Sequence, residues 1–264
     1  VKDLKRCVDS VLNESTYKNF EIIIVENNSE EASIFEYYKE LEKNEKVKII
    51  TYTGGFNYSK INNFAVEQAT GDYVLFLNND TEVITPEWME NMLMYAQRQD
   101  VAAVGAKLYY ADNTIQHAGI VLGLGAHRAA GHTHYKAPQQ HLGYMGRLCY
   151  AQDVSAVTAA CLLVKKSLFD EVGGFDESFT VAFNDVDLCM KFRDKGYLNI
   201  FTPFAEMYHY ESKTRGMEEG EKLRRFEREV AAFRGKWKKD LDAGDPYYNP
   251  NFTLDAADYS LKMD

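Results

Sequence analysis

Residues 1–108 alternate amphipathic segments with short apolar runs. The amphipathic segments repeat apolar residues with the helical period, and the apolar runs have the length of strands. Two runs, EIIIV at 21–25 and YVLFL at 73–77, are nearly continuously apolar, as is typical of parallel strands covered on both faces. In chain order the pattern predicts helix 3–13, strand 21–25, helix 32–43, strand 47–51, helix 58–69, strand 72–77, a helix that begins at Thr85-Pro86, and strand 101–107.

This alternating order predicts an α/β fold with a Rossmann-like, doubly wound and mostly parallel sheet. Ligands of such sheets bind beyond the carboxyl ends of the strands. After residue 108 the periodicity weakens, and residues 109–150 are rich in Gly, His and Tyr. The later elements expected are strand 154–165, helix 166–172, a helix from Asn184 to Lys195, strands 198–202 and 205–210, and a charged helix over 217–239.

The chain shows no internal repeat or low-complexity linker, so we interpret residues 1–264 as a single domain. A first half, 1–108, carries the regular sheet; a second half, 109–216, is more elaborate; a C-terminal helix and tail follow over 217–264. The chain is amphipathic from its first residues, VKDLKRCVDSVLN, and no strand precedes that helix. We therefore expect it to be a segment of a longer polypeptide.

Charge and cysteine content narrow the class of protein. The net charge of −10 argues against non-specific nucleic-acid binding, which needs a basic surface, but leaves room for an anionic ligand in a local basic pocket. The four cysteines are far apart and form no CxxC pair, so we expect reduced thiols in a cytoplasmic compartment. No apolar segment resembles a signal peptide or a transmembrane helix.

Polar side chains follow two of the predicted strands. Asn78, Asn79 and Asp80 come directly after strand 72–77, and the sequence Glu-Asn-Asn-Ser follows strand 21–25. Both strand ends carry carboxylate and amide groups, and we expect them at the same edge of the sheet. They therefore predict a shared polar pocket at that edge. A carboxylate such as that of Asp80 suits a hard divalent cation, which can bridge phosphate oxygens. The alternative is an ordinary polar turn in which Asp80 caps the next segment.

The stretch FNDVDLCMKFRDKGY places two acids at the start of a helix. Asn184 can cap that helix with Asp187 as its reciprocal partner, and Asp185 then lies in the first turn, near the positive end of the helix dipole. The alternative is a functional role for both acids. Asp185 and Asp187 lie about 200° apart around the helix axis and therefore point in different directions. One of them would face a pocket as a general base, and the other would hold the loop.

Histidines form the remaining candidate sites. His209 ends a predicted strand and leads into Lys213 and Arg215, so it could ligate a metal while the two cations meet phosphate. The alternative is a partly buried histidine beside a solvated basic loop. Five more histidines lie at 117, 127, 132, 134 and 141 without Cys or Glu partners at zinc-ligand spacing, so a substrate-lining role fits them better. His132 is the candidate we select.

Five stretches occur in an order that resembles the family 2 glycosyltransferases of the GT-A fold, in a rhamnosyltransferase-like subgroup that builds bacterial surface polysaccharides. They cover most of the chain: CVDSVLNESTYKNFEIIIVENNS, FNYSKINNFAVEQATGDYVLFLNNDTEV, VTAACLLVKKSLFDEVGGFDESF, FNDVDLCMKFRDKGY, and YHYESKTRG with the closing DPYYNPNF. The resemblance implies an inverting, Mn²⁺- or Mg²⁺-dependent enzyme. It would move a sugar from a nucleoside-diphosphate sugar to a hydroxyl of a glycan or lipid-linked acceptor.

The resemblance also implies roles for individual residues. Asp80 matches the second acid of the family's DxD motif, a metal ligand, and Asn78 replaces the first acid; His209 matches a further metal ligand. Asp185 matches the general base of inverting members, while Asn184 stands where many members carry an acid. The expected nucleotide contacts are Glu26, Asn28, Asn63, Asn78, Lys213 and Arg215. The expected donor-sugar or acceptor contacts are Asp187, Asp176, Thr158, Ala159 and His132.

Two other classes of function remain open on the sequence. A nucleotidyltransferase also uses strand-end carboxylates and metal-bound phosphates. An inactive sugar-nucleotide or glycan-binding module would tolerate Asn78 and Asn184 in place of acids. The resemblance further implies a first strand before Val1, a peripheral position at the inner face of the plasma membrane, and further glycosyltransferase domains in the same polypeptide.

Overall fold

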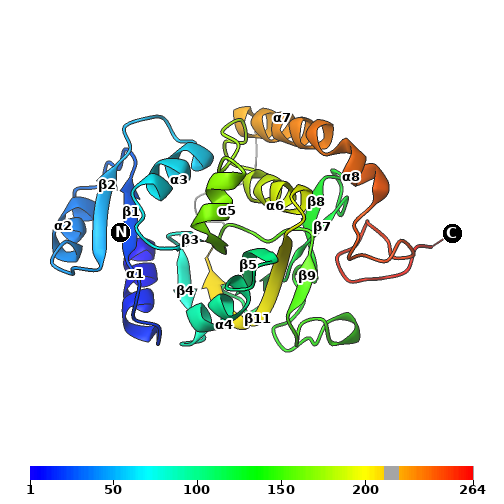
Figure 1. The fold of residues 1–264 in the computed structure, drawn as a ribbon, viewed down its shortest axis with the longest axis horizontal. Helices are drawn as coiled ribbons and strands as arrows, with labels where there is room; N and C mark the ends of the chain where they lie inside the picture. The colour runs from blue at the N-terminus through cyan, green and yellow to red at the C-terminus, as the bar shows by residue number, and fades with distance from the viewer. Residues whose placement is uncertain (211–219, 264) are drawn as a thin grey trace.

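The computed structural model describes residues 1–210 and 220–263 of the chain (Figure 1). Helices and strands alternate through the first half as the hydrophobic periodicity predicts, which confirms the α/β class. These elements are α1 (Lys2–Glu14), β1 (Ile22–Glu26), α2 (Ala32–Leu41), β2 (Val47–Thr51), α3 (Tyr58–Glu67), β3 (Tyr73–Leu77), β4 (Thr81–Val83), α4 (Trp88–Ala96) and β5 (Val101–Tyr109).

The second half is more irregular and contains several three-residue strands. Its elements are β6 (Ile115–His117), β7 (Ile120–Leu122), β8 (Ala130–His132), the 3₁₀ helix η1 (Tyr144–Gly146), β9 (Gln152–Val154), β10 (Cys161–Lys165), α5 (Lys166–Glu171), α6 (Asn184–Asp194), β11 (Leu198–His209), α7 (Glu221–Lys236) and α8 (Lys238–Ala243). The apolar run at 154–165, predicted as one strand, is divided between β9 and β10. Residues 155–160 between them are mostly buried, so the hydrophobic pattern carries no sign of the break.

Three predicted element boundaries are corrected by the structure. α4 begins at Trp88, because the Trp88 N–H binds the Thr85 carbonyl at 3.1 Å and a turn precedes the helix. The two strands expected at 198–202 and 205–210 form the single strand β11, with a bulge between Thr202 and Glu206. The helix expected over 217–239 is two helices, α7 and α8, which meet at Trp237; residues 217–219 lie outside the described range.

The principal sheet is mixed, which corrects the expectation of a mostly parallel sheet. Its strand order is β3-β10-β5-β11-β4, with β6 paired to β5 and β9 paired to β11. β5 and β11 run parallel, but β10 is antiparallel to both β3 and β5. The reason is topological: β10 enters the sheet after the long excursion over 110–160 rather than through a helical crossover of the βαβ type. Such crossovers are what make neighbouring strands parallel.

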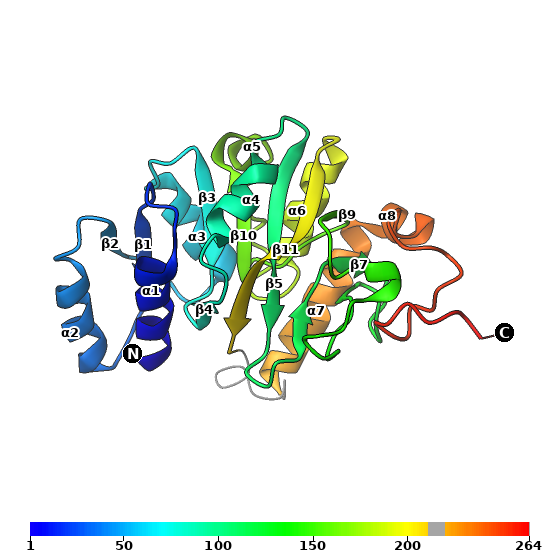
Figure 2. The same cartoon turned by 90° about the horizontal axis from the view of Figure 1, so that it is seen from below.

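β1 and β2 form a separate parallel pair. α1 lies between this pair and the principal sheet, as both views show (Figures 1 and 2). Its Val8 shares an apolar cluster with Tyr37 of α2 and Val47 of β2, and its Val11 shares another with Trp88, beside the principal sheet. The amphipathic face predicted for this helix is therefore shared between two apolar clusters. The strand ends of β1 and β3, expected at one sheet edge, belong to different sheets.

α7 runs across one side of the molecule and covers α6 (Figure 1). Aromatic side chains join the two: Phe183, just before α6, stacks on Phe226 and Phe233 of α7 with centroid distances of 5.9 and 5.0 Å. Phe233 is fully buried. This packing fixes the start of α6, where the candidate base lies, beneath a helix from the C-terminal part of the chain.

Candidate active site

The turn that follows β3 sets the position of Asp80. The Asn78 N–H donates to the Ala160 carbonyl at 3.0 Å, and the Asn78 carbonyl accepts the Thr81 hydroxyl at 2.9 Å. The Asp80 carbonyl in turn accepts the Tyr210 N–H at 2.9 Å, at the end of β11. The backbone polar groups at the end of β3 are thus satisfied by neighbouring chain segments, and the Asp80 side chain is left for other partners.

Asp80 and His209 are brought together as the metal hypothesis requires. The Asp80 Oδ1 lies 3.1 Å from His209 Nε2, and Asn78 Nδ2 lies 3.1 Å from the same nitrogen. Burial raises the pKa of Asp80, but the hydrogen bond and charge of His209 outweigh it, so the pKa lies below its usual value. Asp80 is therefore a carboxylate at neutral pH, the form that binds a cation.

These two side chains fit a divalent cation that takes its other ligands from substrate and water. Within residues 1–210 and 220–263, no group of three or more His, Cys, Asp or Glu side chains could hold a metal. Mg²⁺ and similar cations are commonly bound by one or two protein groups together with substrate phosphates. Asp80 supplies oxygen and His209 supplies nitrogen, a pair that suits Mn²⁺ as well.

Asp185 lies in the first turn of α6 and is turned toward the segment that precedes β10. Its Oδ2 accepts the Ala159 N–H at 3.0 Å, and its Oδ1 accepts the Val186 N–H at 2.8 Å. The residue before the helix, Phe183, adopts a left-handed conformation with φ of 63°. Asn184 is therefore the first helical residue rather than the cap, which corrects the capping prediction; its side chain accepts the Asp185 N–H at 2.7 Å.

Residues Thr158, Ala159 and Ala160, here called the 158–160 segment, connect the two halves of the site. Ala159 binds Asp185 through its N–H, and Ala160 binds the Asn78 turn through its carbonyl. The hydroxyl of Tyr58 on α3 donates to the Ala159 carbonyl at 3.2 Å. Burial, followed by the negative charge of Asp185, raises the pKa of Tyr58, so the hydroxyl stays protonated as a donor. Sequence reasoning missed Tyr58, because nothing in helix 58–69 marks it.

His132 reaches this segment through another histidine. Its Nδ1 lies 2.9 Å from His117 Nδ1, and His117 Nε2 accepts the Thr158 N–H at 3.5 Å. His117 is fully buried. Burial, followed by the charges of His132 and His209, lowers the pKa of His117 well below its usual value, so its ring is neutral. The structure thus connects His132, through His117, to the 158–160 segment, whose Ala159 bonds Asp185.

Asp187 and Asp176 have other partners. Asp187 is fully buried, and its Oδ1 accepts Trp237 Nε1 at 2.8 Å and Lys236 Nζ at 2.7 Å. The same Lys236 contacts Asp176 at 2.8 Å. Burial raises the pKa of Asp176, but its hydrogen bonds from Lys236 and Ser178 outweigh this and lower the pKa to about 2. Both acids bind Lys236 and so fasten α7 to the rest of the fold, while the substrate contacts expected for them stay a prediction.

The residues expected at the nucleotide also have structural partners. Glu26 accepts the Tyr38 hydroxyl at 2.7 Å and the Ser29 N–H at 2.6 Å. Asn28 is left-handed with φ of 57° and donates to the Gly54 carbonyl at 3.0 Å. Asn63 exchanges hydrogen bonds of 2.9 and 3.0 Å with the Phe175 backbone. These bonds shape the surrounding loops and do not join Glu26, Asn28 or Asn63 to Asp80.

Lys213 and Arg215, the cations expected at the diphosphate, lie outside the described residues. Gln116 is a residue of the site that sequence reasoning missed. Its Oε1 lies 2.7 Å from His209 Nδ1, and both side chains are buried. The stretch around it has little periodicity, so no pattern indicated that a three-residue strand would place Gln116 beside the candidate metal ligand.

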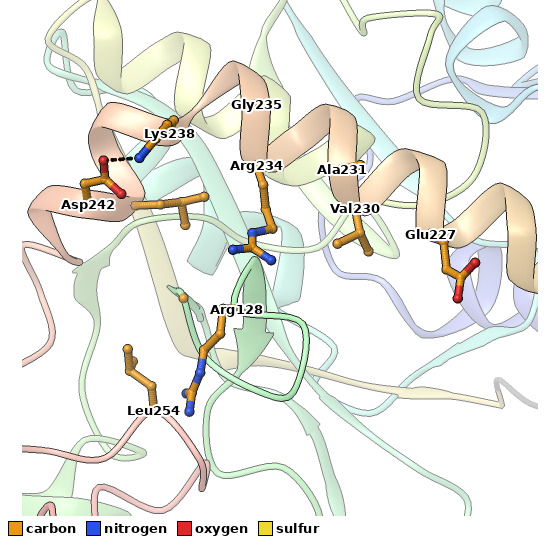
Figure 3. Close-up of a pocket in the computed structure, with 11 residues that line it drawn as sticks. Arg128, Glu227, Val230, Ala231, Arg234, Gly235, Lys238, Asp242 and Leu254 are labelled. Atoms are coloured by element: carbon orange, nitrogen blue, oxygen red, sulfur yellow. Dashed lines mark hydrogen bonds and ion pairs between the residues drawn. The ribbon is translucent and has the colours of Figure 1, made fainter.

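A separate cavity of about 640 Å³ lies between α7, α8, the loop after β7 and Leu254 (Figure 3). Arg128 and Arg234 approach it from opposite sides, but Arg128 is paired with Asp255, and Lys238 is paired with Asp242 at 2.5 Å. None of the residues predicted for the active site lines it. The lining residues are Gly123, Arg128, Glu227, Val230, Ala231, Arg234, Gly235, Lys238, Leu241, Asp242 and Leu254.

The geometry described above agrees with the family to which the sequence is similar. Residues 1–173 match the family model described as Glycosyl transferase family 2, and the chain belongs to this family. The class of protein is a glycosyltransferase with the GT-A fold, as predicted. In addition, the chain is 14% identical to a solved structure of GalNAc-T7 with UDP, GalNAc and Mn²⁺, at a TM-score of 0.71 over 91% of this chain and 46% of that one.

Two curated relatives match nearly the whole chain. The protein y4gI of Sinorhizobium fredii is 49% identical over 261 residues, which are 98% of this chain and 28% of the relative. The O-antigen biosynthesis protein RfbC of Myxococcus xanthus is 36% identical over 260 residues, 98% of this chain and 20% of the relative. The chain therefore spans less than a third of the length of either relative. In the described part of the chain, no helix combines the length and the apolar character needed to cross a membrane.

Proposed function

We propose that this domain is an inverting, metal-dependent glycosyltransferase that acts on a nucleoside-diphosphate sugar. The observation that supports it most is the arrangement of two candidate groups around one segment. Asp80 and His209 are connected with Ala160 of the 158–160 segment through Asn78, and Asp185 binds the N–H of the adjacent Ala159. This segment therefore connects a candidate cation site with a candidate base. The cation site would bind the donor diphosphate on one side of the anomeric carbon, and the base would meet the acceptor hydroxyl on the other side.

Asp80 and His209 would hold Mn²⁺ or Mg²⁺. A cation held there would supply positive charge against the negative charge of the departing nucleoside diphosphate. The Asn78 amide lies beside His209 and can donate a hydrogen bond to a phosphate oxygen. With Asn in place of the first acid of the DxD motif, the site has one carboxylate less to offer a cation, and more of the oxygen ligands would have to come from the diphosphate and water.

Asp185 would act as the general base. An acceptor hydroxyl attacks the anomeric carbon from the face opposite the leaving group, and its proton passes to a carboxylate oxygen of Asp185. The new bond joins acceptor oxygen to carbon, and the bond from that carbon to the phosphate oxygen breaks, its electron pair leaving with the diphosphate. The Ala159 N–H holds Oδ2 in place, so the carboxylate keeps one orientation toward the acceptor.

The biological setting proposed is the synthesis of bacterial cell-surface polysaccharide. The name of the Myxococcus xanthus relative, an O-antigen biosynthesis protein, supports it. A glycan or lipid-linked acceptor, a peripheral position at the membrane, and further glycosyltransferase domains in the same polypeptide belong to the same proposal. The lengths of the two relatives, of which this chain covers 28% and 20%, leave room for such domains.

The test is a panel of sugar nucleotides incubated with the protein, an acceptor glycan and Mn²⁺, with release of nucleoside diphosphate as the measurement. We expect one donor to be consumed in a metal-dependent way and the product linkage to have the anomeric configuration opposite to that of the donor. Retention of configuration, or release that is unchanged by removing the metal with EDTA, would contradict the proposal. Binding of a sugar nucleotide without turnover would favour the inactive-module alternative.

A further inference from the structure

The loop just before α6, residues 180–183, is bound by one buried carboxylate from α7. Glu229 is 5% exposed and accepts four hydrogen bonds from this loop. Its Oε1 accepts the N–H and the hydroxyl of Thr180 at 2.7 and 2.6 Å and the Val181 N–H at 3.1 Å. Its Oε2 accepts the Ala182 N–H at 2.9 Å. Three successive backbone N–H groups therefore point at a single side chain.

A carboxylate matches this set of donors, because both of its oxygens accept hydrogen bonds. A glutamine at 229 would have nearly the same shape, but it would offer one oxygen and one donating NH₂ group. Either the Ala182 N–H or the donors of Thr180 and Val181 would then face another donor. A buried N–H group without an acceptor is costly, so the acid and its position on α7 are both needed to hold the loop.

Phe183, the last residue of the loop, has a backbone conformation that needs support. Its φ of 63° lies in the left-handed region, which residues other than glycine rarely adopt. Such a conformation persists only where the surrounding contacts enforce it. Here the contacts come from α7. Glu229 binds the backbone just before Phe183, and Phe226 and Phe233 stack on its ring.

Asp185 is the second residue of α6, so its place depends on where that helix begins. No side-chain hydrogen bond of Phe183 caps the helix. The loop is also connected with the segment that bonds Asp185. The Tyr58 N–H donates to the Thr180 carbonyl at 2.9 Å, and the Tyr58 hydroxyl donates to the Ala159 carbonyl at 3.2 Å. α3 and α7 thus bind the loop through different groups.

We infer that Glu229 is a positioning residue for the candidate base: it fixes the loop before α6, and thereby the direction in which the Asp185 carboxylate faces the acceptor. Glu229 acts through the backbone of residues 180–182 rather than through a contact with substrate. The role of Asp185 as a base rests on the proposed function. The hydrogen bonds between Glu229 and the loop do not.

The expected consequence of losing Glu229 is a loss of rate rather than of donor binding. A displacement of about 1 Å in a reacting group can lower a rate about 100-fold. The candidate ligands of the metal and the donor diphosphate, Asp80 and Asn78, follow β3, whereas Glu229 binds the loop before α6. kcat per folded molecule should therefore fall while the affinity for the sugar nucleotide stays nearly unchanged. A loss of global stability alone would reduce the amount of folded protein instead.

Glu229→Gln and the control Glu227→Gln test this role. Glu227 lies two positions earlier in α7, is exposed, and lines the separate cavity. At a temperature where circular dichroism shows both variants to be folded, we expect kcat for nucleoside-diphosphate release to fall by about 10- to 100-fold in Glu229→Gln. Donor affinity, measured by calorimetry, should be nearly unchanged, and Glu227→Gln should keep the native kcat. Native kcat in Glu229→Gln, or an equal fall in both variants, would overturn the inference.

A double variant distinguishes an effect on the base from a general effect on the site. If Glu229 acts through Asp185, Glu229→Gln should lower kcat little further once Asp185→Asn has removed the base. The same fold-loss in the Asp185→Asn background as in the native protein would show that Glu229 acts on another part of the site, and the inference would fail.

Amide hydrogen exchange tests the hold on the loop without any turnover. In the native protein the N–H groups of Val181 and Ala182 should exchange more slowly than those of an unstructured peptide. Their exchange should be faster in Glu229→Gln and native in Glu227→Gln. Exchange at the unstructured rate in the native protein would overturn the inference, whether or not Glu229→Gln folds.

These outcomes separate the inference from the proposed function. If the native protein releases nucleoside diphosphate from no sugar nucleotide, but Glu229→Gln speeds the exchange of the loop amides, the proposed function fails and the hold of Glu229 on the loop stands. If turnover is found and Glu229→Gln keeps the native kcat, the proposed function stands and this inference fails.

Discussion

Asp185 and Asp187 lie two positions apart in α6 and have different environments. Asp185 is half-buried and bonded to the Ala159 N–H, whereas Asp187 is fully buried against Trp237 and Lys236. The helical twist places two such positions about 200° apart, so they face different parts of the protein. The side chain at 187 holds α7 rather than the loop that the sequence suggested. Similar residues in one short motif therefore have separate roles, chemical for Asp185 in our proposal and structural for Asp187.

Replacing Asp187 should lower stability. Asp187→Ala removes the acceptor of Trp237 Nε1 and the partner of Lys236, and breaking such a buried charged pair costs about 3 kcal/mol. We expect the free energy of unfolding, measured with urea, to fall by that order. Asp176→Ala is the control, because it removes the more exposed contact of the same Lys236 together with the local hydrogen bonds from Ser178. A smaller loss in Asp187→Ala than in Asp176→Ala would show that Asp187 does not anchor α7.

At the scale of elements, β5 determines how closely the 158–160 segment approaches the sheet. Every residue of β5 is buried, and Gly105 lies at its centre. A Cβ at Gly105 would lie closer than 3.0 Å to the Cβ of Val157, the residue just before Thr158. Only glycine at position 105 leaves room for Val157 at this distance. The position of the 158–160 segment, which bonds Asp185, therefore depends on a residue without a side chain in β5.

Gly105→Ala should therefore destabilise the protein by about 1–3 kcal/mol, the usual cost of overpacking a core. Because the clash involves the Cβ of Val157, Val157→Gly should relieve it and Val157→Ala should not. Double-mutant cycles on the free energy of unfolding measure this difference as a coupling energy. Equal coupling with both Val157 variants would mean that the backbone moves apart and that the close approach is not required.

Some elements could be predicted from the sequence and others could not, for physical reasons. α1 repeats its apolar residues with the helical period, and β3 is a continuous apolar run. Either pattern is enough to predict whether the element is a helix or a strand. The break between β9 and β10 was missed because buried loop residues are as apolar as buried strand residues. β6 was missed because a three-residue strand is too short to show a period. Gln116, which lies on this strand, was missed for the same reason. The lysine at 236 was not connected with Asp187, because that ion pair joins segments far apart in the chain.

At the scale of the whole molecule, the candidate site is assembled from both halves of the chain. Asp80 comes from the first half, Asp185 and His209 come from the second, and the 158–160 segment bonds to both sides. The resemblance predicted that Asp80 and His209 would meet, and the structure shows this contact. Glu26 and Asn63, which were expected to contact the nucleotide, bind backbone groups of nearby loops. Sequence patterns do not reveal such side chain–backbone hydrogen bonds.

A site shared between both halves should couple ligand binding to global stability. With Mn²⁺ and a nucleoside diphosphate at about 100 times the dissociation constant, we expect a stabilisation of about 2.7 kcal/mol. Thermal unfolding with and without these ligands measures it. Asp80→Ala should abolish the gain, and EDTA should do the same for the native protein. An equal gain in Asp80→Ala would mean that the metal and diphosphate bind elsewhere.

The central claim is that Asp185 accepts the proton while Asp80 and His209 bind the metal and the donor. The most direct measurement is kcat for nucleoside-diphosphate release by Asp185→Asn, together with donor binding by calorimetry. Loss of the base should lower kcat by about 10²–10⁴-fold, with donor affinity nearly unchanged, whereas Asp80→Ala should also weaken donor binding. An Asp185→Asn protein with native kcat would contradict the assignment of the base.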